Sequence, residues 1–137
     1  MFRVVQEISF CYGHRLLNYV GKCQYLHGHN ARALVALEAE SLDHRGMVID
    51  FGDIKQSLQT WVDDELDHRM LLCRDDPALP VLKDLGEPVF EMEGNPTAEN
   101  IARLIFEQAE RLGLPVVEVV LWETPRSSAT YRKHPGS

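Results

Sequence analysis

The sequence has few cysteines, no long hydrophobic run and a deficit of basic residues. Its three cysteines, Cys11, Cys23 and Cys73, are an odd number without the spacing of a disulfide framework, so we expect free thiols in a reducing compartment. No apolar stretch approaches the roughly 18 residues of a membrane span, and the first residues follow a strand-like pattern rather than that of a signal peptide. We therefore expect a cytoplasmic protein with no membrane partner.

The charge balance argues against a nucleic-acid partner. The chain has 14 Lys and Arg against 21 Asp and Glu, a formal net charge of -7. No segment concentrates the basic residues, and an acidic surface repels a phosphate backbone. A length of 137 residues with 45% hydrophobic residues instead predicts one globular domain, residues 1–137, with a packed core.

Apolar and polar residues alternate with the period of a half-buried strand near both ends of the chain. The predicted strands cover residues 2–10, 27–39, 47–49, 117–123 and 129–132. The segment 11–26 shows neither the strand nor the helix period, which predicts a loop between the first two strands.

A helical period of 3.6 residues occupies the middle of the chain. It predicts an amphipathic helix from Ile54 to Leu66, with Asp50 or Asp53 as its N-terminal cap. A second helix is expected to begin after the cap residue Thr97 and to end at Gly113. The Pro and Gly residues between these helices predict an irregular connection.

The main order is therefore two strands, two helices and two strands, without β-α-β alternation. This order favours the α+β class, as a four-stranded antiparallel sheet with two helices on one face. Such an open sheet leaves two edges unpaired, and association with other subunits is one way to cover them.

A His-x-His pair stands at the start of the second predicted strand. Residues two apart on a strand face the same way, about 6.6 Å along the chain, so His27 and His29 can share one ion at about 2.0–2.1 Å from each nitrogen. His14 follows the first strand, and antiparallel pairing would bring it to the same place. Three imidazoles leave a fourth position open, as in a catalytic zinc site. A half-exposed polar strand end is the alternative for the pair alone, and Cys23 as a fourth ligand would make the site structural.

Several other residues suit acid–base chemistry. Cys23 has Lys22 and the expected metal nearby, and positive charge increases the thiolate fraction; the alternative is a small buried side chain. Asp67 and His68 could form a carboxylate–imidazole pair. Glu123 ends a strand on its apolar face, so its carboxylate needs donors, either from a ligand with two adjacent N–H groups or from the protein.

Together these residues resemble the 6-pyruvoyl-tetrahydropterin synthase and 6-carboxytetrahydropterin synthase family over nearly the whole chain. The segments that carry the resemblance are 9–10, 14–16, 21–23, 27–29, 47–51, 54–55, 66–68, 96–99, 123–124 and 129–131. The resemblance implies a tunnelling fold, in which three subunits close a twelve-stranded barrel and two trimers form a homohexamer. It also implies 7,8-dihydroneopterin triphosphate as the substrate.

The resemblance further implies a role for each candidate residue. His14, His27 and His29 would bind Zn²⁺ and Cys23 would be the general base. Asp67 and His68, from a neighbouring subunit, would handle protons. Glu123 would anchor the pterin ring.

The three-residue gap between Cys23 and His27 is similar to that of the bacterial 6-carboxytetrahydropterin synthases of queuosine precursor synthesis. We therefore expect the carboxy product, with acetaldehyde and triphosphate released. Formation of 6-pyruvoyltetrahydropterin is the alternative, and a non-catalytic structural zinc domain is an alternative of another class.

Three features depart from the family pattern. Tyr12 stands where a small residue is expected, Leu72 stands where Asn is expected, and the connection 73–94 is longer than in compact members. These departures bear on substrate preference. Candidates for holding the triphosphate are Lys22, Arg15 and Arg126.

Overall fold

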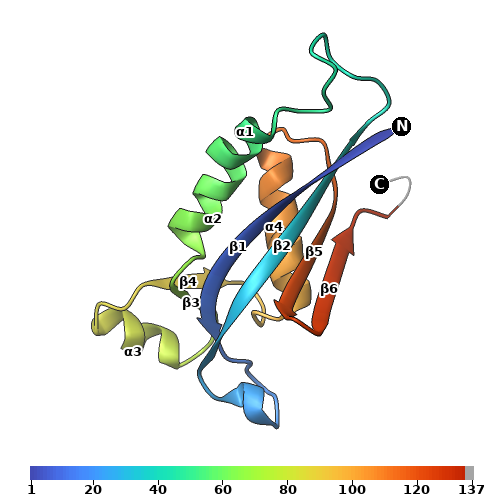
Figure 1. The fold of residues 1–137 in the computed structure, drawn as a ribbon. Coiled ribbons are helices and arrows are strands. Elements are labelled where there is room, and N and C mark those ends of the chain that lie inside the picture. The colour runs from blue at the N-terminus through green and yellow to red at the C-terminus, as the bar shows by residue number, and fades with distance from the viewer. Residues whose placement is uncertain (135–137) are drawn as a thin grey trace.

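The computed structural model, described for residues 1–134, consists of a curved sheet with helices packed against it (Figure 1). Residues 135–137 of the predicted domain lie outside this range. The strands are β1 (Phe2–His14), β2 (His27–Ala39), β3 (Arg69–Cys73), β4 (Val89–Met92), β5 (Val116–Thr124) and β6 (Ser127–Arg132). The helices are α1 (Phe51–Ile54), α2 (Thr60–Glu65), α3 (Ala78–Asp84) and α4 (Ala98–Arg111), with a 3₁₀ turn at Lys22–Gln24 and a π-helical segment at Lys55–Gln59.

The α+β class is confirmed, but the prediction of a four-stranded antiparallel sheet is wrong. The sheet has six strands in the order β4-β3-β1-β2-β5-β6. The antiparallel part, β1-β2-β5-β6, is extended by β3, which lies parallel to β1, and by β4, which lies parallel to β3. With α3 between them, β3 and β4 form a β-α-β unit. These strands have only five and four residues, too few for alternation to distinguish them from loop.

The short strand expected at residues 47–49 is also absent from the described structure. This segment forms bends after a turn in which the N–H of Asp43 donates to the carbonyl oxygen of Met47 over 2.9 Å. Val48 and Ile49 still pack against the core. Their apolar character therefore reflects burial without strand pairing.

Both predicted main helices are present. The N-cap of the first is Asp50, whose side chain accepts a hydrogen bond from the N–H of Gly52, and the helix runs continuously through α1, the π-helical segment and α2. The second helix is α4, with Thr97 as its N-cap. Both helices contribute to one core cluster with the same face of β1, β2 and β5. The buried residues of β1 on that face are Ile8, Phe10, Tyr12 and His14.

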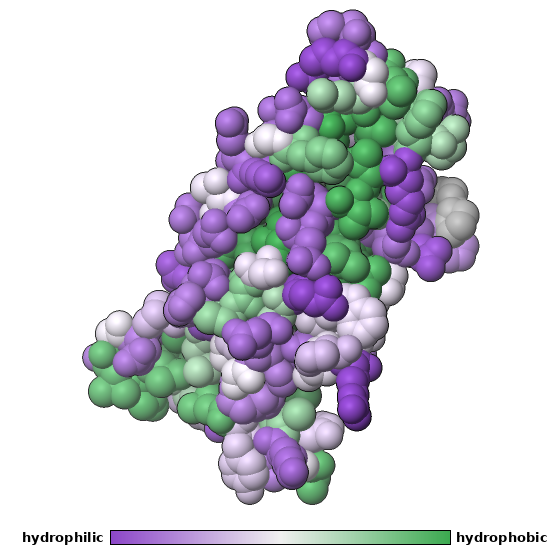
Figure 2. All heavy atoms as spheres, viewed as in Figure 1, coloured by the Kyte–Doolittle hydropathy of each residue, from purple (hydrophilic) through white to green (hydrophobic). Residues whose placement is uncertain are grey.

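The opposite face of the sheet mixes charged residues with apolar ones such as Leu34 and Trp122, and among the described residues β4 and β6 are the open edges. On the view in Figure 2, apolar side chains also gather over α3, where Val81 and Leu85 are 56% and 70% exposed. Open edges and exposed apolar side chains suit a protein that associates, but the oligomer stays a prediction. No described helix has both the length and the apolar character needed to span a bilayer.

Candidate metal and active site

The three histidines converge where β1 ends and β2 begins. In the antiparallel register His14 is paired with His27, and Tyr12 with His29, so all of these side chains share the core face of the sheet. The imidazole centroids are 4.5–5.0 Å apart, and one ligand nitrogen from each ring lies within 4.8 Å of the other two. The sequence prediction that His14 joins the His-x-His pair is realised in space.

Hydrogen bonds to backbone carbonyls orient two of the rings. Nδ1 of His14 donates to the carbonyl oxygen of Pro96, and Nδ1 of His27 donates to that of Tyr25, each over 2.7 Å. In neutral rings the two Nε2 atoms then both present lone pairs, and they lie only 3.0 Å apart. Two facing lone pairs repel each other unless a cation lies between them. Histidines that bind a metal usually donate their other ring N–H to a carbonyl or carboxylate in this way, which fixes the orientation of the ring.

The third histidine, His29, also has a ring nitrogen that is available to bind a metal. Nε2 of His29 is buried and has no hydrogen-bond partner among the described residues. Burial lowers the pKa of His29 and the pKa of His14, which keeps both rings neutral and their nitrogens available as ligands. The donor set therefore fits a metal ion held by three imidazoles.

Glu123 adjoins this cluster. Its Oε2 accepts a hydrogen bond from the hydroxyl of Tyr12 over 3.1 Å, and its Oε1 lies 3.5 Å from Nε2 of His29. Burial and the charge of Glu123 raise the pKa of Tyr12, so the phenol remains a donor. The carboxylate also lines a cavity of about 360 Å³ with Glu99, from the start of α4. The sequence interpretation did not include the contact between Glu123 and Tyr12, and Glu99 entered it only as part of the segment 96–99 that carries the family resemblance.

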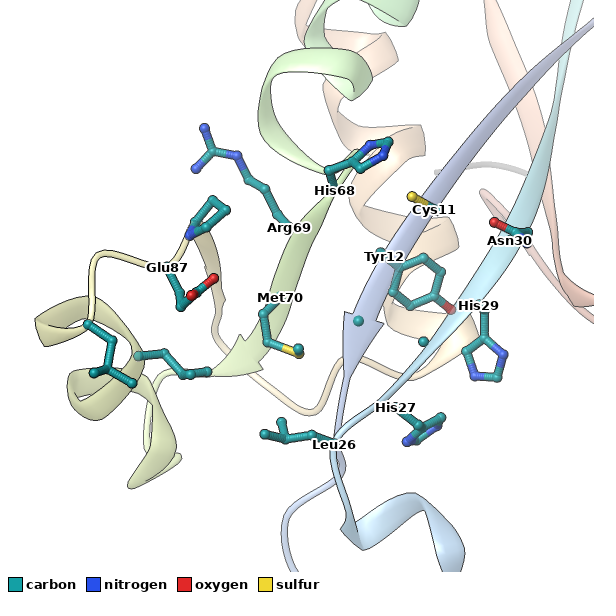
Figure 3. A pocket seen from close by; sticks show the side chains of 15 residues that line it. Cys11, Tyr12, Leu26, His27, His29, Asn30, His68, Arg69, Met70 and Glu87 are labelled. Atoms are coloured by element: carbon teal, nitrogen blue, oxygen red, sulfur yellow. The ribbon is translucent and has the colours of Figure 1, made fainter.

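Asp67 and His68 lie on the other side of β1. Oδ2 of Asp67 accepts a hydrogen bond from Nδ1 of His68 over 2.7 Å. Burial acts to raise the pKa of Asp67, but hydrogen bonds from the Cys11 N–H and from His68 outweigh it and hold that pKa below the usual range. In Figure 3 the His68 ring lies on the Cys11 side of β1, whereas the rings of His27 and His29 project from β2 away from it. Within one chain the pair therefore does not face the imidazole cluster.

Cys23 is half-buried in the 3₁₀ turn between β1 and β2. Its carbonyl oxygen accepts from the N–H of Leu16 over 2.8 Å, which anchors the turn to the chain leaving His14. Among the described residues, its thiol does not belong to the group of ligand atoms formed by the three imidazoles. The thiol is thus near the cluster in sequence, but its sulfur is not within 4.8 Å of all three ligand nitrogens.

The comparisons with known proteins identify the family. The model of the family described as 6-pyruvoyl tetrahydropterin synthase matches residues 3–134. The chain belongs to this family. The 6-carboxy-5,6,7,8-tetrahydropterin synthase of Rickettsia bellii is 37% identical over 132 residues, which cover 91% of this chain and 96% of the relative. Since the relative is named as a synthase, the prediction that the chain is an enzyme is confirmed.

Two solved structures share the fold of this chain, and the second of them is a named 6-pyruvoyl tetrahydropterin synthase. An uncharacterized protein from Wolinella succinogenes has a TM-score of 0.82 at 27% identity. The superposition covers 97% of this chain and 98% of that chain. The 6-pyruvoyl tetrahydropterin synthase of Caenorhabditis elegans has a TM-score of 0.73 at 26% identity, with 97% of this chain and 96% of that chain covered. The mixed sheet is therefore a feature of the family fold.

One of the three residues considered for triphosphate binding is already engaged in this member of the 6-pyruvoyl tetrahydropterin synthase family. Nε of Arg15 donates to Oδ2 of Asp76 over 2.7 Å, and a second guanidinium nitrogen pairs with Oδ1. The Asp76 side chain is fully buried and also accepts from the N–H of Ala78 at the start of α3. Arg15 thus joins the end of β1 to α3, and Lys22 and Arg126 stay candidates for triphosphate binding.

We expect Arg15→Met to destabilise the fold by about 3 kcal/mol, because it leaves the Asp76 carboxylate buried without its ionic partner. The measurement is urea unfolding at pH 7. The Arg15 hydrogen bonds lower the pKa of Asp76 in the folded state, so their contribution is present above the unfolded pKa of about 3.9 and is lost as the pH falls through the folded value.

The matched control is Arg103→Met, which removes an exposed pair with Glu107 at 3.5 Å and should cost no more than about 0.5 kcal/mol. Equal effects of the two substitutions would contradict a structural role for Arg15.

Proposed function

We propose that this protein is a zinc-dependent lyase that converts 7,8-dihydroneopterin triphosphate and water into 6-carboxy-5,6,7,8-tetrahydropterin, acetaldehyde and triphosphate. The observation that carries the proposal is the three-imidazole cluster beside Glu123, in a chain whose relatives are named 6-carboxy-5,6,7,8-tetrahydropterin synthases. We further propose that the protein acts in the cytoplasm, in the synthesis of queuosine precursors.

Zinc is the proposed metal because the donor set consists of three imidazole nitrogens. This set suits Zn²⁺ better than Mg²⁺ or Ca²⁺, which prefer oxygen ligands, and it leaves one position for substrate. Zinc held by the three imidazoles would lower the pKa of the hydroxyl groups of the substrate side chain. We propose His14, His27 and His29 as the ligands of the zinc ion, because one nitrogen of each ring lies within 4.8 Å of the other two.

The other residues hold the substrate and move protons. Glu123 would accept two hydrogen bonds from adjacent N–H groups of the pterin ring, and the hydroxyl of Tyr12 would hold the carboxylate in place through Oε2. Cys23 would remove a proton from the substrate side chain, and His68 would exchange protons on the other side. Asp67 would keep Nδ1 of His68 protonated, so that Nε2 is the nitrogen that acts.

A homohexamer is part of the proposal. His68 is 79% exposed and lies across β1 from the imidazoles of its own chain, so it is available to a different subunit. Association through the open edges of the sheet would bring Asp67 and His68 of one subunit to the metal of another. In that arrangement activity requires the assembled protein.

The alternative product is 6-pyruvoyltetrahydropterin, formed by loss of triphosphate without loss of the two-carbon fragment. The similarity to the 6-pyruvoyl tetrahydropterin synthase of Caenorhabditis elegans keeps this alternative open. The short connection between Cys23 and His27 favours the carboxy product.

The test is to incubate the zinc-loaded protein with dihydroneopterin triphosphate and to identify the products by mass spectrometry. We expect 6-carboxytetrahydropterin and acetaldehyde in equal amounts. The pyruvoyl product without acetaldehyde would establish the alternative, and no reaction would contradict both enzymatic proposals.

A further inference from the structure

A second group of metal-ligating side chains lies on the face of β1 opposite to the imidazole cluster. It consists of Cys11, Asp67 and His68, and one ligand atom of each lies within 4.8 Å of the other two. Neighbouring residues of a strand point to opposite faces, so Cys11 faces away from Tyr12 and from the site that holds the three histidines. The two groups are therefore separated by the sheet itself.

Backbone hydrogen bonds fix the position of this second group. The N–H of Cys11 donates to Oδ1 of Asp67 over 2.9 Å, and the N–H of His68 donates to the carbonyl oxygen of Cys11 over 2.7 Å. These two bonds attach the chain to β1 just before β3 begins. The cysteine and the carboxylate are thus held side by side without a metal.

His68 has the left-handed φ of 60°, a conformation that costs energy for a residue with a side chain. This conformation places its imidazole next to Cys11, as Figure 3 shows. Strained residues of this kind are concentrated at functional sites. A thiol, a carboxylate and an imidazole consequently meet at one point, beside a cavity of about 480 Å³ that all three line.

We propose that Cys11, Asp67 and His68 form a second zinc site, distinct from the three-histidine cluster. With Zn–S near 2.3 Å and Zn–N and Zn–O near 2.0 Å, the donor atoms of a tetrahedral site are about 3.2–3.6 Å apart. The present separations are at most 4.8 Å, and rotation of the exposed His68 ring would adjust the two that involve its nitrogen. A thiolate ligand selects Zn²⁺ over Mg²⁺ and Ca²⁺, and the cavity leaves a fourth position for water.

The second site fills after the first. Nδ1 of His14 is already held by a carbonyl and its ring is buried, whereas the His68 ring is 79% exposed and loses rotamer freedom when it binds. The first equivalent of metal therefore enters the imidazole cluster. The second equivalent enters the group on the opposite face.

Occupancy of the second site inhibits the enzyme; this consequence rests on the proposed function. A cation bound to His68 takes the lone pair with which the imidazole would accept a proton. It also engages the carboxylate that orients that ring. Zinc beyond one equivalent per chain therefore removes the proton-handling pair while the catalytic metal stays in place.

The test is a titration of the metal-free protein with Co²⁺, which takes the place of Zn²⁺ and absorbs light. We expect two ions per chain, with sulfur-to-cobalt charge-transfer absorption appearing only on the second equivalent. Cys11→Ser should bind one ion and lose that absorption. The matched control Cys23→Ser removes a half-buried thiol outside the group and should bind two ions with the absorption retained.

A second variant, His68→Asn, keeps a residue that tolerates the left-handed conformation and should also bind a single ion. Binding of one ion by the wild-type chain, or loss of the absorption in Cys23→Ser rather than in Cys11→Ser, would overturn the proposal. These results do not depend on turnover, so they are distinct from a failure of the proposed activity. In an active preparation, we expect the rate at two equivalents of Zn²⁺, divided by the rate at one equivalent, to be well below one in the wild type. The same quotient should be near one in Cys11→Ser.

Discussion

Replacing Cys23 with alanine is expected to lower the turnover rate by about 10²–10⁴-fold while the chain keeps one tightly bound zinc ion. The reason is that the thiol lies outside the group of three imidazoles and, in the proposed mechanism, is the base that removes the substrate proton. The measurements are steady-state kinetics with dihydroneopterin triphosphate and metal analysis after dialysis against metal-free buffer.

Cys73→Ala provides the control, because Cys73 is a buried thiol on β3 whose contact is the carbonyl oxygen of Glu93. It should retain both zinc and turnover. Loss of the tightly bound zinc together with activity in Cys23→Ala would show that the sulfur is a ligand. In that case the structural interpretation of the site would replace the catalytic one.

Removal of the metal is expected to abolish activity and to leave the fold intact. Either chelation or His27→Ala should lower the rate by about three orders of magnitude, because a catalytic metal contributes several kcal/mol to transition-state stabilisation. The circular dichroism spectrum should persist, since the core cluster of apolar residues between the sheet and the helices does not include the three histidines.

The control for the histidine substitution is His44→Ala, in an exposed turn far along the sequence from the cluster, which should keep metal and activity. Unfolding on chelation would contradict the proposal, because a domain that depends on zinc for its structure loses its fold with the ion. The two outcomes separate the enzyme from the non-catalytic zinc domain.

The candidate metal cluster was largely predictable from the sequence because it depends on strand periodicity. Once residues 2–10 and 27–39 are assigned as strands, antiparallel pairing brings His14 to His27 and His29. The structure adds what periodicity does not contain, namely the carbonyl oxygens of Pro96 and Tyr25 that orient the rings. Those contacts arise from loops whose paths depend on tertiary packing.

The region between the two main helices was not predictable in the same way. β3 and β4 are short, and they depend on parallel pairing of β3 with β1, which is distant in sequence, and of β4 with β3. Leu71 and Leu72 are both fully buried, so β3 shows no alternation of exposed and buried residues that would have revealed it. The predicted irregular connection therefore contains an edge of the sheet.

The contacts of Tyr12 explain what this residue does at a position where the family pattern has a small side chain. The sequence suggested only that a bulky residue would reshape the pocket. In the structure the Tyr12 ring packs against His14 and His29, and its hydroxyl holds Glu123. The larger side chain thus connects the proposed pterin anchor to the metal ligands.

The alternation of side chains along β1 limits how this protein can evolve. Tyr12 and His14 serve one face of the strand and Cys11 serves the other, so a single-residue insertion or deletion between them would exchange the two sets. Both groups would be lost in one step. Substitutions at the end of this strand can therefore accumulate one at a time during evolution. An insertion or deletion of one residue there would remove both groups of side chains and should be selected against.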